Sequence, residues 1–144
     1  MKVDTEISNY IATLPAAKQT DMHALYDLII SIMPNSKLWF LDGRDESGKV
    51  VSNPNIGFGS YTIHYADRKS KEFYQIGLSA NTTGISVYIM GINDRKLLVE
   101  NFASSIGKAS VTGYCIKFKS LKDIDQNVLE EAIRLGLKES TKSN

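Results

Sequence analysis

Residues 57–65, which read GFGSYTIHY, hold the side chains that most readily suggest chemistry. Ser60, Tyr61 and His64 are residue types that hydrolytic enzymes use as nucleophile, acid and base. On an extended strand, residues four apart are separated by about 13 Å, which is too far for Ser60 and His64 to share a hydrogen bond. We therefore predict no catalytic pair here, and we interpret the stretch first as a strand.

The other metal-ligating or nucleophilic residue types are few and scattered. His23 and His64 are the two histidines, and neither belongs to the spacing of a zinc-binding motif. Cys115 is the single cysteine, so it forms no internal disulfide and no cysteine cluster. Reactivity of its thiol would require a nearby cation such as Lys117, and a buried strand residue is the favoured interpretation. We predict no catalytic residue, no metal ligand and no cofactor from the residues alone.

The length, hydrophobic content and net charge of the chain limit the kinds of partner that it is expected to bind. The chain has 144 residues, 42% of them hydrophobic, and a formal net charge of +1, which favours one domain and gives no overall attraction to nucleic acid. The apolar run LIISIM is much shorter than a membrane span, and the opening MKVDTEISNY lacks the apolar core of a signal peptide. The expectation is a cytoplasmic protein with no nucleic-acid partner and no membrane partner.

Four helices are predicted from apolar spacing and end signals. Val3, Ile7 and Ile11 recur at intervals of four, and Pro15 and Pro34 end the first two periodic segments. Asp125 is a suitable N-cap for the last helix, and Gly107 is a suitable left-handed stop after the third. The expected helices are 3–14, 16–33, 95–106 and 126–138.

Five strands are predicted from alternating apolar residues bounded by turn residues. They read KLWFL, IGFGSYTIHY, EFYQIGLS, GISVYIM and YCIKFKS. Only ANTTG separates the third from the fourth, so these two should form an antiparallel hairpin. The expected fold is α+β, a two-layer sandwich with the order ααββββαβα, in which helices cover one face of a mainly antiparallel five-stranded sheet.

Strand parity divides the predicted sheet into a core face and an open face. Leu78, Val87 and Ile116 belong to the core face, together with Tyr61 and Ile63. The open face then receives Phe58, Ser60, His64, Phe73, Gln75, Tyr88, Met90, Cys115 and Lys117. A bulge at Gly57 or Gly59 would reverse part of this assignment.

Several segments of the sequence resemble the YdhG-like family of small bacterial proteins of unknown function. They are the opening ISNYIATLPAAKQTDMHALYDLI, the run GFGSY at 57–61, the hairpin GLSANTTGISVYIMG, GK at 107–108 and LKDID at 121–125. The resemblance covers nearly the whole chain and implies one domain over residues 1–138, a polar tail at 139–144 and a frataxin-like sandwich. One relative has been treated as an iron chaperone, so the resemblance also implies iron binding.

Two functions are therefore expected. The first is a non-catalytic binding module that uses the open sheet face for a small ligand, a partner or self-association, because large apolar groups there stand among polar ones. Its candidate binding residues are Phe58, Ser60, His64, Gln75, Tyr88 and Lys117. The alternative is a frataxin-like iron chaperone. A structural interpretation also stays open, in which Trp39 and the loop 42–55 fold over this face and close it as a second small core.

Overall fold

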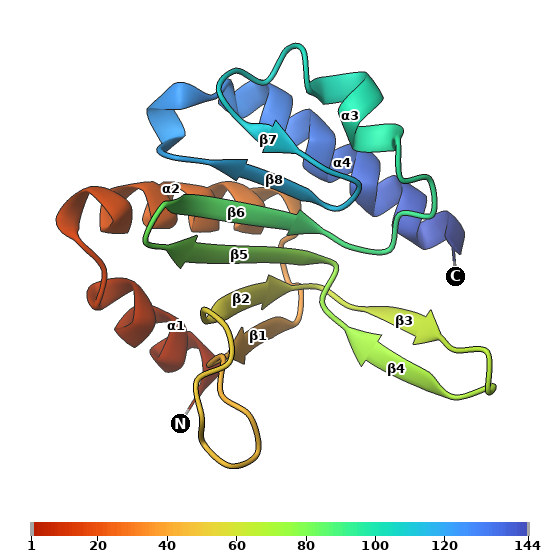
Figure 1. Cartoon of the computed structure of the whole chain (residues 1–144), viewed down its shortest axis with the longest axis horizontal. Helices are drawn as coiled ribbons and strands as arrows, with labels where there is room; N and C mark the ends of the chain where they lie inside the picture. Colours follow the sequence, from red (N-terminus) through yellow and green to blue (C-terminus); the bar gives the residue numbers. More distant parts are fainter. Residues whose placement is uncertain (1, 144) are drawn as a thin grey trace.

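Helices and antiparallel strands form two layers in the computed structural model, which describes residues 2–143 and, at 141–143, the backbone alone (Figure 1). The helices are α1 (Val3–Ala12), α2 (Ala16–Ile32), α3 (Leu97–Phe102) and α4 (Gln126–Ser143), with a short 3-10 turn at Leu121–Asp123. The strands are β1 (Leu38–Leu41), β2 (Asn55–Phe58), β3 (Tyr61–His64), β4 (Ser70–Phe73), β5 (Ile76–Asn81), β6 (Gly84–Ile89), β7 (Ser110–Val111) and β8 (Cys115–Phe118).

The strands form two separate sheets. Six of them make an antiparallel sheet in the order β1-β2-β5-β6-β8-β7, while β3 and β4 pair only with each other. The predicted α+β class, the antiparallel pairing and the β5–β6 hairpin across ANTTG are confirmed. The predicted five-stranded, frataxin-like sheet is wrong, because two predicted strands each divide in two and the short β7 adds an edge.

The first division occurs at Gly59. This residue has a φ of 72°, a left-handed conformation that glycine adopts without strain, and Ser60 after it is exposed. The chain therefore leaves the main sheet after Phe58 and enters the β3–β4 hairpin. Figure 1 shows this hairpin projecting from one end of the main sheet.

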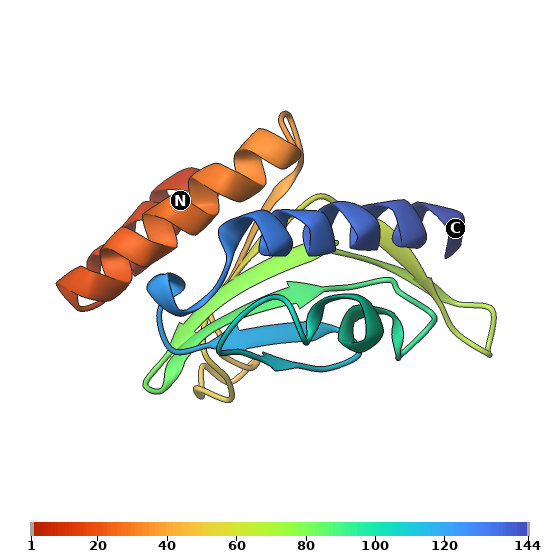
Figure 2. The same cartoon turned by 90° about the horizontal axis from the view of Figure 1, so that it is seen from above.

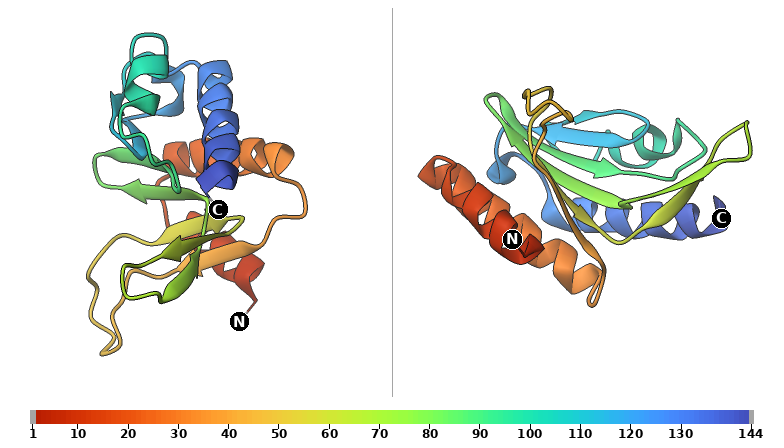
Figure 3. Two further views of the ribbon diagram at one scale, coloured as in Figure 1. Left: turned by 90° about the vertical axis from the view of Figure 1, so that its right-hand side faces the viewer. Right: turned by 90° about the horizontal axis from the view of Figure 1, so that it is seen from below.

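Three of the four helices cover one face of the main sheet. Figure 2 and the right-hand view of Figure 3 show α1, α2 and α4 on the same side of it, and α3 contacts the edge strand β7. Leu78, Val87 and Ile116 are completely buried between these layers, which confirms their predicted core positions. The predicted open position of Phe58 is wrong: its side chain is completely buried, with its ring centroid 5.5 Å from that of Tyr26 in α2.

Strand alternation predicted the wrong face for Phe58, because the alternation was followed across Gly59, where the chain passes from β2 to β3. The prediction assigns Tyr61 and Ile63 to the core face of the same strand, which places Phe58 on the opposite face. With the strand ending at Phe58, the alternation instead follows Ile56, which pairs with the buried Leu78.

Polar contacts fasten α1 to the sheet and cap the start of α4. The Tyr10 hydroxyl in α1 accepts from the amide of Ala80 at 3.0 Å and donates to its carbonyl at 3.3 Å, where β5 extends past the end of β2. The Asp125 carboxylate accepts from the amides of Asn127 and Val128, so the predicted cap of α4 is confirmed.

The predicted C-terminal ends of α3 and α4 were less accurate. α3 ends at Phe102, five residues before Gly107, although Gly107 does have a φ of 109°. α4 continues to Ser143, so the predicted tail is helical at 139–143, and residue 144 lies outside the described residues. None of the helices described is both long and apolar enough to cross a membrane.

Candidate binding surface and hairpin cleft

A layer of aromatic rings covers the β1–β2–β5 half of the helix-free sheet face. The Tyr74 ring lies over Gly57 and Gly77, where an added Cβ would come within 2.7 and 2.6 Å of its ring carbons. Tyr74 is 5% exposed, Phe73 stacks on it at 4.2 Å, and Trp39 meets Phe73 edge-on at 6.1 Å. The two glycines thus make room for an aromatic layer that closes this half.

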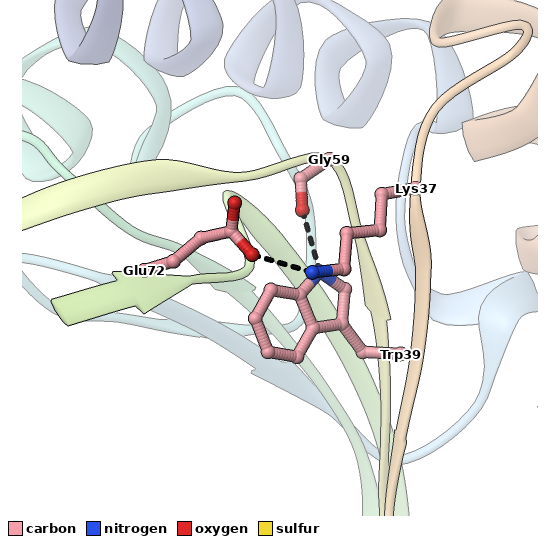
Figure 4. A network of polar contacts seen from close by, with 4 residues as sticks. All are labelled: Lys37, Trp39, Gly59 and Glu72. Carbon is pink, nitrogen blue, oxygen red and sulfur yellow. Dashed lines mark hydrogen bonds and ion pairs between the residues drawn. The ribbon is translucent and has the colours of Figure 1, made fainter.

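Trp39 also joins strand β1 to the base of the hairpin (Figure 4). Its indole N–H donates to the carbonyl of Gly59 at 2.8 Å. The Lys37 ammonium lies 4.2 Å from the Trp39 ring centroid and forms an ion pair with Glu72 in β4. These contacts hold the hairpin against β1 at two points, the break at Gly59 and Glu72 in β4.

The loop 42–55 contacts the helix-free face at its end. The Ser79 hydroxyl donates to the carbonyl of Pro54 at 2.7 Å, whereas Val50 and Val51 near the tip are 60% and 62% exposed. The contacts of Trp39 and of the end of this loop therefore support closure of the β1–β2–β5 half of the face, whereas Tyr88 is partly exposed and Tyr114 is 55% exposed.

The remaining half of the face carries the residues that we call the Tyr88 surface: Tyr88, Tyr114, Cys115 and Lys117. The rings of Tyr88 and Tyr114 stack at 6.2 Å with an interplanar angle of 15°. Burial raises the pKa of Tyr88, and burial raises the pKa of the Cys115 thiol more than Ser86 and Lys117 lower it. Cys115 is therefore protonated at neutral pH, which makes it a weak nucleophile.

A pocket of about 440 Å³ lies beside the Tyr88 surface, and we call it the hairpin cleft. All four residues of β3 line it, and no residue of β4 does. The segment 90–93, which follows β6, forms the opposite wall, and Tyr114 lies at the boundary with the Tyr88 surface. Because only β3 contributes from the hairpin, the cleft follows the edge of β3 that faces away from β4.

The structure separates the six residues predicted to bind a ligand. Phe58 is in the core, and Ser60 is exposed at the break between sheets. The Gln75 amide donates to the Ser140 hydroxyl in α4, so this side chain is directed to the helical layer. Tyr88 and Lys117 do share the helix-free face, and His64 lines the hairpin cleft. Whether these residues bind a ligand stays a prediction.

No spacing or motif in the sequence indicated the second wall of the cleft. Met90 was placed on the open face by parity, but Gly91, Ile92 and Asn93 form an irregular segment that no motif identified. Tyr114 was also missed, because its 55% exposure is a property of the structure that no spacing in the sequence indicates.

No group of three His, Cys, Asp or Glu side chains among the described residues is placed to hold a metal ion. The carboxylate of Asp45 is occupied within its own loop, where it accepts from Ser47 and Lys49. These hydrogen bonds, that of Ser47 first, lower the pKa of Asp45. The iron-chaperone alternative stays a prediction without support from the described side chains.

We expect Gly59→Ala to destabilise the protein more than Gly48→Ala. Both glycines have positive φ, so each alanine meets a left-handed strain of about 1–2 kcal/mol. At Gly59 an added Cβ would also lie 2.5 Å from Oε1 of Gln75 and 2.6 Å from Met33, whereas nothing lies within 4 Å at Gly48. Urea unfolding of both variants measures the difference, and equal losses would mean that the tips of Gln75 and Met33 move aside without cost.

Comparison of the chain with models of protein families, with curated proteins and with solved structures found no match. The resemblance to the YdhG-like family therefore stays a prediction.

Proposed function

We propose that this protein is a non-catalytic binding module whose ligand occupies the hairpin cleft and contacts the adjoining Tyr88 surface. The observation that carries the proposal is the cleft itself. Its volume of about 440 Å³ lies within the range of small-molecule and cofactor sites. Its lining comes from β3, from the segment 90–93 and from Tyr114, which are distant in sequence.

The chemical character of the cleft also supports binding. Tyr61, Ile63 and Ile92 are partly buried and offer apolar contact, while Thr62 and His64 offer exposed polar groups. Such a mixture of apolar walls with a few polar groups is typical of ligand sites.

Two features favour binding over catalysis. The Cys115 thiol, with its raised pKa, is not an activated nucleophile. Among the described side chains, no imidazole is hydrogen-bonded to a hydroxyl or a thiol. Nucleophilic catalysis uses such a pair to activate the nucleophile. We therefore assign no reaction to this site.

The test uses indole and p-cresol as probes, because they carry the aromatic groups that an apolar cleft with Tyr114 at its mouth should accept. In amide NMR spectra at millimolar probe, we expect saturable shift changes at 61–64 and 90–93. Tyr114→Ala should weaken them. Val99→Ala, which removes another exposed side chain from α3, should leave them unchanged.

The groove between α1 and β1, lined by Tyr10 and Phe40, provides an internal comparison. Shift changes that are as large there as in the hairpin cleft would mean that the probes bind unselectively. That result, or the absence of saturable changes in the cleft, would contradict the proposed function.

A further inference from the structure

The free edge of β3 has backbone groups that the hairpin does not use. The Tyr65 amide donates to the Lys69 carbonyl at 2.9 Å, just beyond the pairs His64–Ser70 and Ile63–Lys71. In an antiparallel pair, residues alternate between those bonded to the partner strand and those whose backbone groups face away from it. Tyr61, Ile63 and Tyr65 are therefore bonded toward β4, and the amides and carbonyls of Thr62 and His64 face the opposite side.

That opposite side is the hairpin cleft. All of β3 and none of β4 lines it, so the outward backbone groups of Thr62 and His64 are directed to the cleft. Pairs of N–H and C=O groups repeating at every second residue are complementary to another extended main chain. A compact ligand satisfies one such pair, whereas an extended peptide satisfies both.

We propose that the hairpin cleft binds an extended peptide, which adds to β3 as a third strand. This inference rests on the proposed function and names the class of ligand. Main-chain hydrogen bonds to Thr62 and His64 would supply affinity and register, and alternate peptide side chains would contact the cleft walls. The mode is strand addition at a sheet edge, which exposed edges support in many peptide-binding domains.

The walls indicate the composition of the peptide. The nine described lining residues include no Asp, Glu, Lys or Arg. Met90, Ile92 and Tyr114 offer apolar or aromatic surface on the side facing β3. An uncharged segment with apolar residues at alternate positions therefore fits, because a charged side chain directed at these walls would lose water without gaining an ionic partner.

A single extended segment fits better than a second copy of this chain. In each copy the β3 edge faces its own 90–93 wall, which would stand between two β3 edges brought together. A free peptide carries no such wall. Self-association through β3 is therefore an outcome that the test must distinguish.

The experiment screens a random heptapeptide display library against the 144-residue chain. We expect enrichment of uncharged peptides with apolar residues at alternate positions. The best peptide is then titrated against two variants, Thr62→Pro and Ser70→Pro. Each removes one amide that faces away from the partner strand, but Thr62 lies on the cleft edge and Ser70 on the outer edge of β4. The structure places both residues at exposed positions, where a strand tolerates proline.

Binding should weaken at least about tenfold in Thr62→Pro and stay unchanged in Ser70→Pro, since only the first loses a hydrogen bond to the peptide. A synthetic copy of the peptide with alternate N-methylated amides should lose binding to wild type in the same way. Matching thermal melts of the two variants confirm that the hairpin remains folded. If Thr62→Pro alone melts early, the N-methylated peptide on wild type decides the question.

Three results would overturn the inference. These are no enrichment from the library, equal binding of the N-methylated peptide, and a concentration-dependent dimer in sedimentation that Thr62→Pro abolishes. In the first two cases, selective cleft binding of indole and p-cresol would leave the proposed function intact while strand addition fails. Loss of probe binding as well would remove both.

Discussion

Phe58→Ala should lower the free energy of unfolding by about 3–5 kcal/mol, the usual cost of emptying a buried aromatic site. The Phe58 side chain is completely buried between β2 and α2, where it meets the Tyr26 ring. Its removal leaves a cavity that the neighbouring helix and strand fill only in part. Urea denaturation at neutral pH measures the loss.

Tyr88→Ala is the matched control, because Tyr88 is a large aromatic residue of the same sheet on the helix-free face. Its ring is partly exposed and stacks on the more exposed Tyr114, so its removal opens no closed cavity. A clearly smaller loss is expected. If the two variants lost equal stability, the helix-free face would pack as tightly as the core, and the Tyr88 surface would not be available to a ligand.

The second large effect should appear at alkaline pH. Burial raises the pKa of Tyr74, and the negative charges that Tyr88, Tyr61 and Cys115 acquire at high pH raise it further. Burial also raises the pKa of Tyr10, more than its hydrogen bonds to Ala80 and Ser79 lower it. Both phenols thus hold their protons more tightly in the folded protein than in the unfolded chain.

The direction of the pH dependence follows from this difference. A raised folded-state pKa contributes stability that is fully present below the unfolded tyrosine value, about 10, and is lost as pH rises toward the folded value. Each such tyrosine should lower the free energy of unfolding by about 1.4 kcal/mol per pH unit in that window. Urea denaturation at successive pH values from neutral to strongly alkaline measures the slope.

Tyr74→Phe separates the hydroxyl from the ring. The phenylalanine ring can still cover Gly57 and Gly77, so stability at neutral pH should stay close to that of wild type. The alkaline slope should fall by the contribution of one proton. An unchanged slope would show that Tyr74 does not titrate on unfolding as its burial requires.

The sequence predicted the parts of the fold that have uninterrupted periodicity. The four-residue recurrence of Val3, Ile7 and Ile11 located α1. The short ANTTG connection predicted the β5–β6 pairing, and the alternation through Leu78 and Val87 predicted its core face. These signals are local, and the core that they predict is the core observed.

The errors arose where one predicted strand spans a change of sheet. The apolar residues of 56–65 change phase between Phe58 and Tyr61, and the left-handed conformation of Gly59 at that point divides the stretch between β2 and β3. Residues 72–79 divide in the same way between β4 and β5, which turns Tyr74 to the helix-free face and the Gln75 side chain toward α4. An alternating pattern cannot show which neighbour a strand will pair with, since that choice depends on distant residues.

The candidate site was predictable only in part for the same reason. Parity placed Tyr88 and Lys117 together on the helix-free face, and the structure agrees. The hairpin cleft depends on how far β3 diverges from the segment 90–93, and this is set by Gly59 and by the contacts of Trp39. No spacing within either segment contains that information.

The ring of Tyr74 over Gly57 and Gly77 also constrains how this sequence can evolve. A side chain at either glycine collides with the ring, so such a substitution is tolerated only after residue 74 has become small. Replacing Tyr74 first exposes the strands but creates no collision. The three positions are therefore epistatic, and related chains should reach a different aromatic layer by changing residue 74 before either glycine.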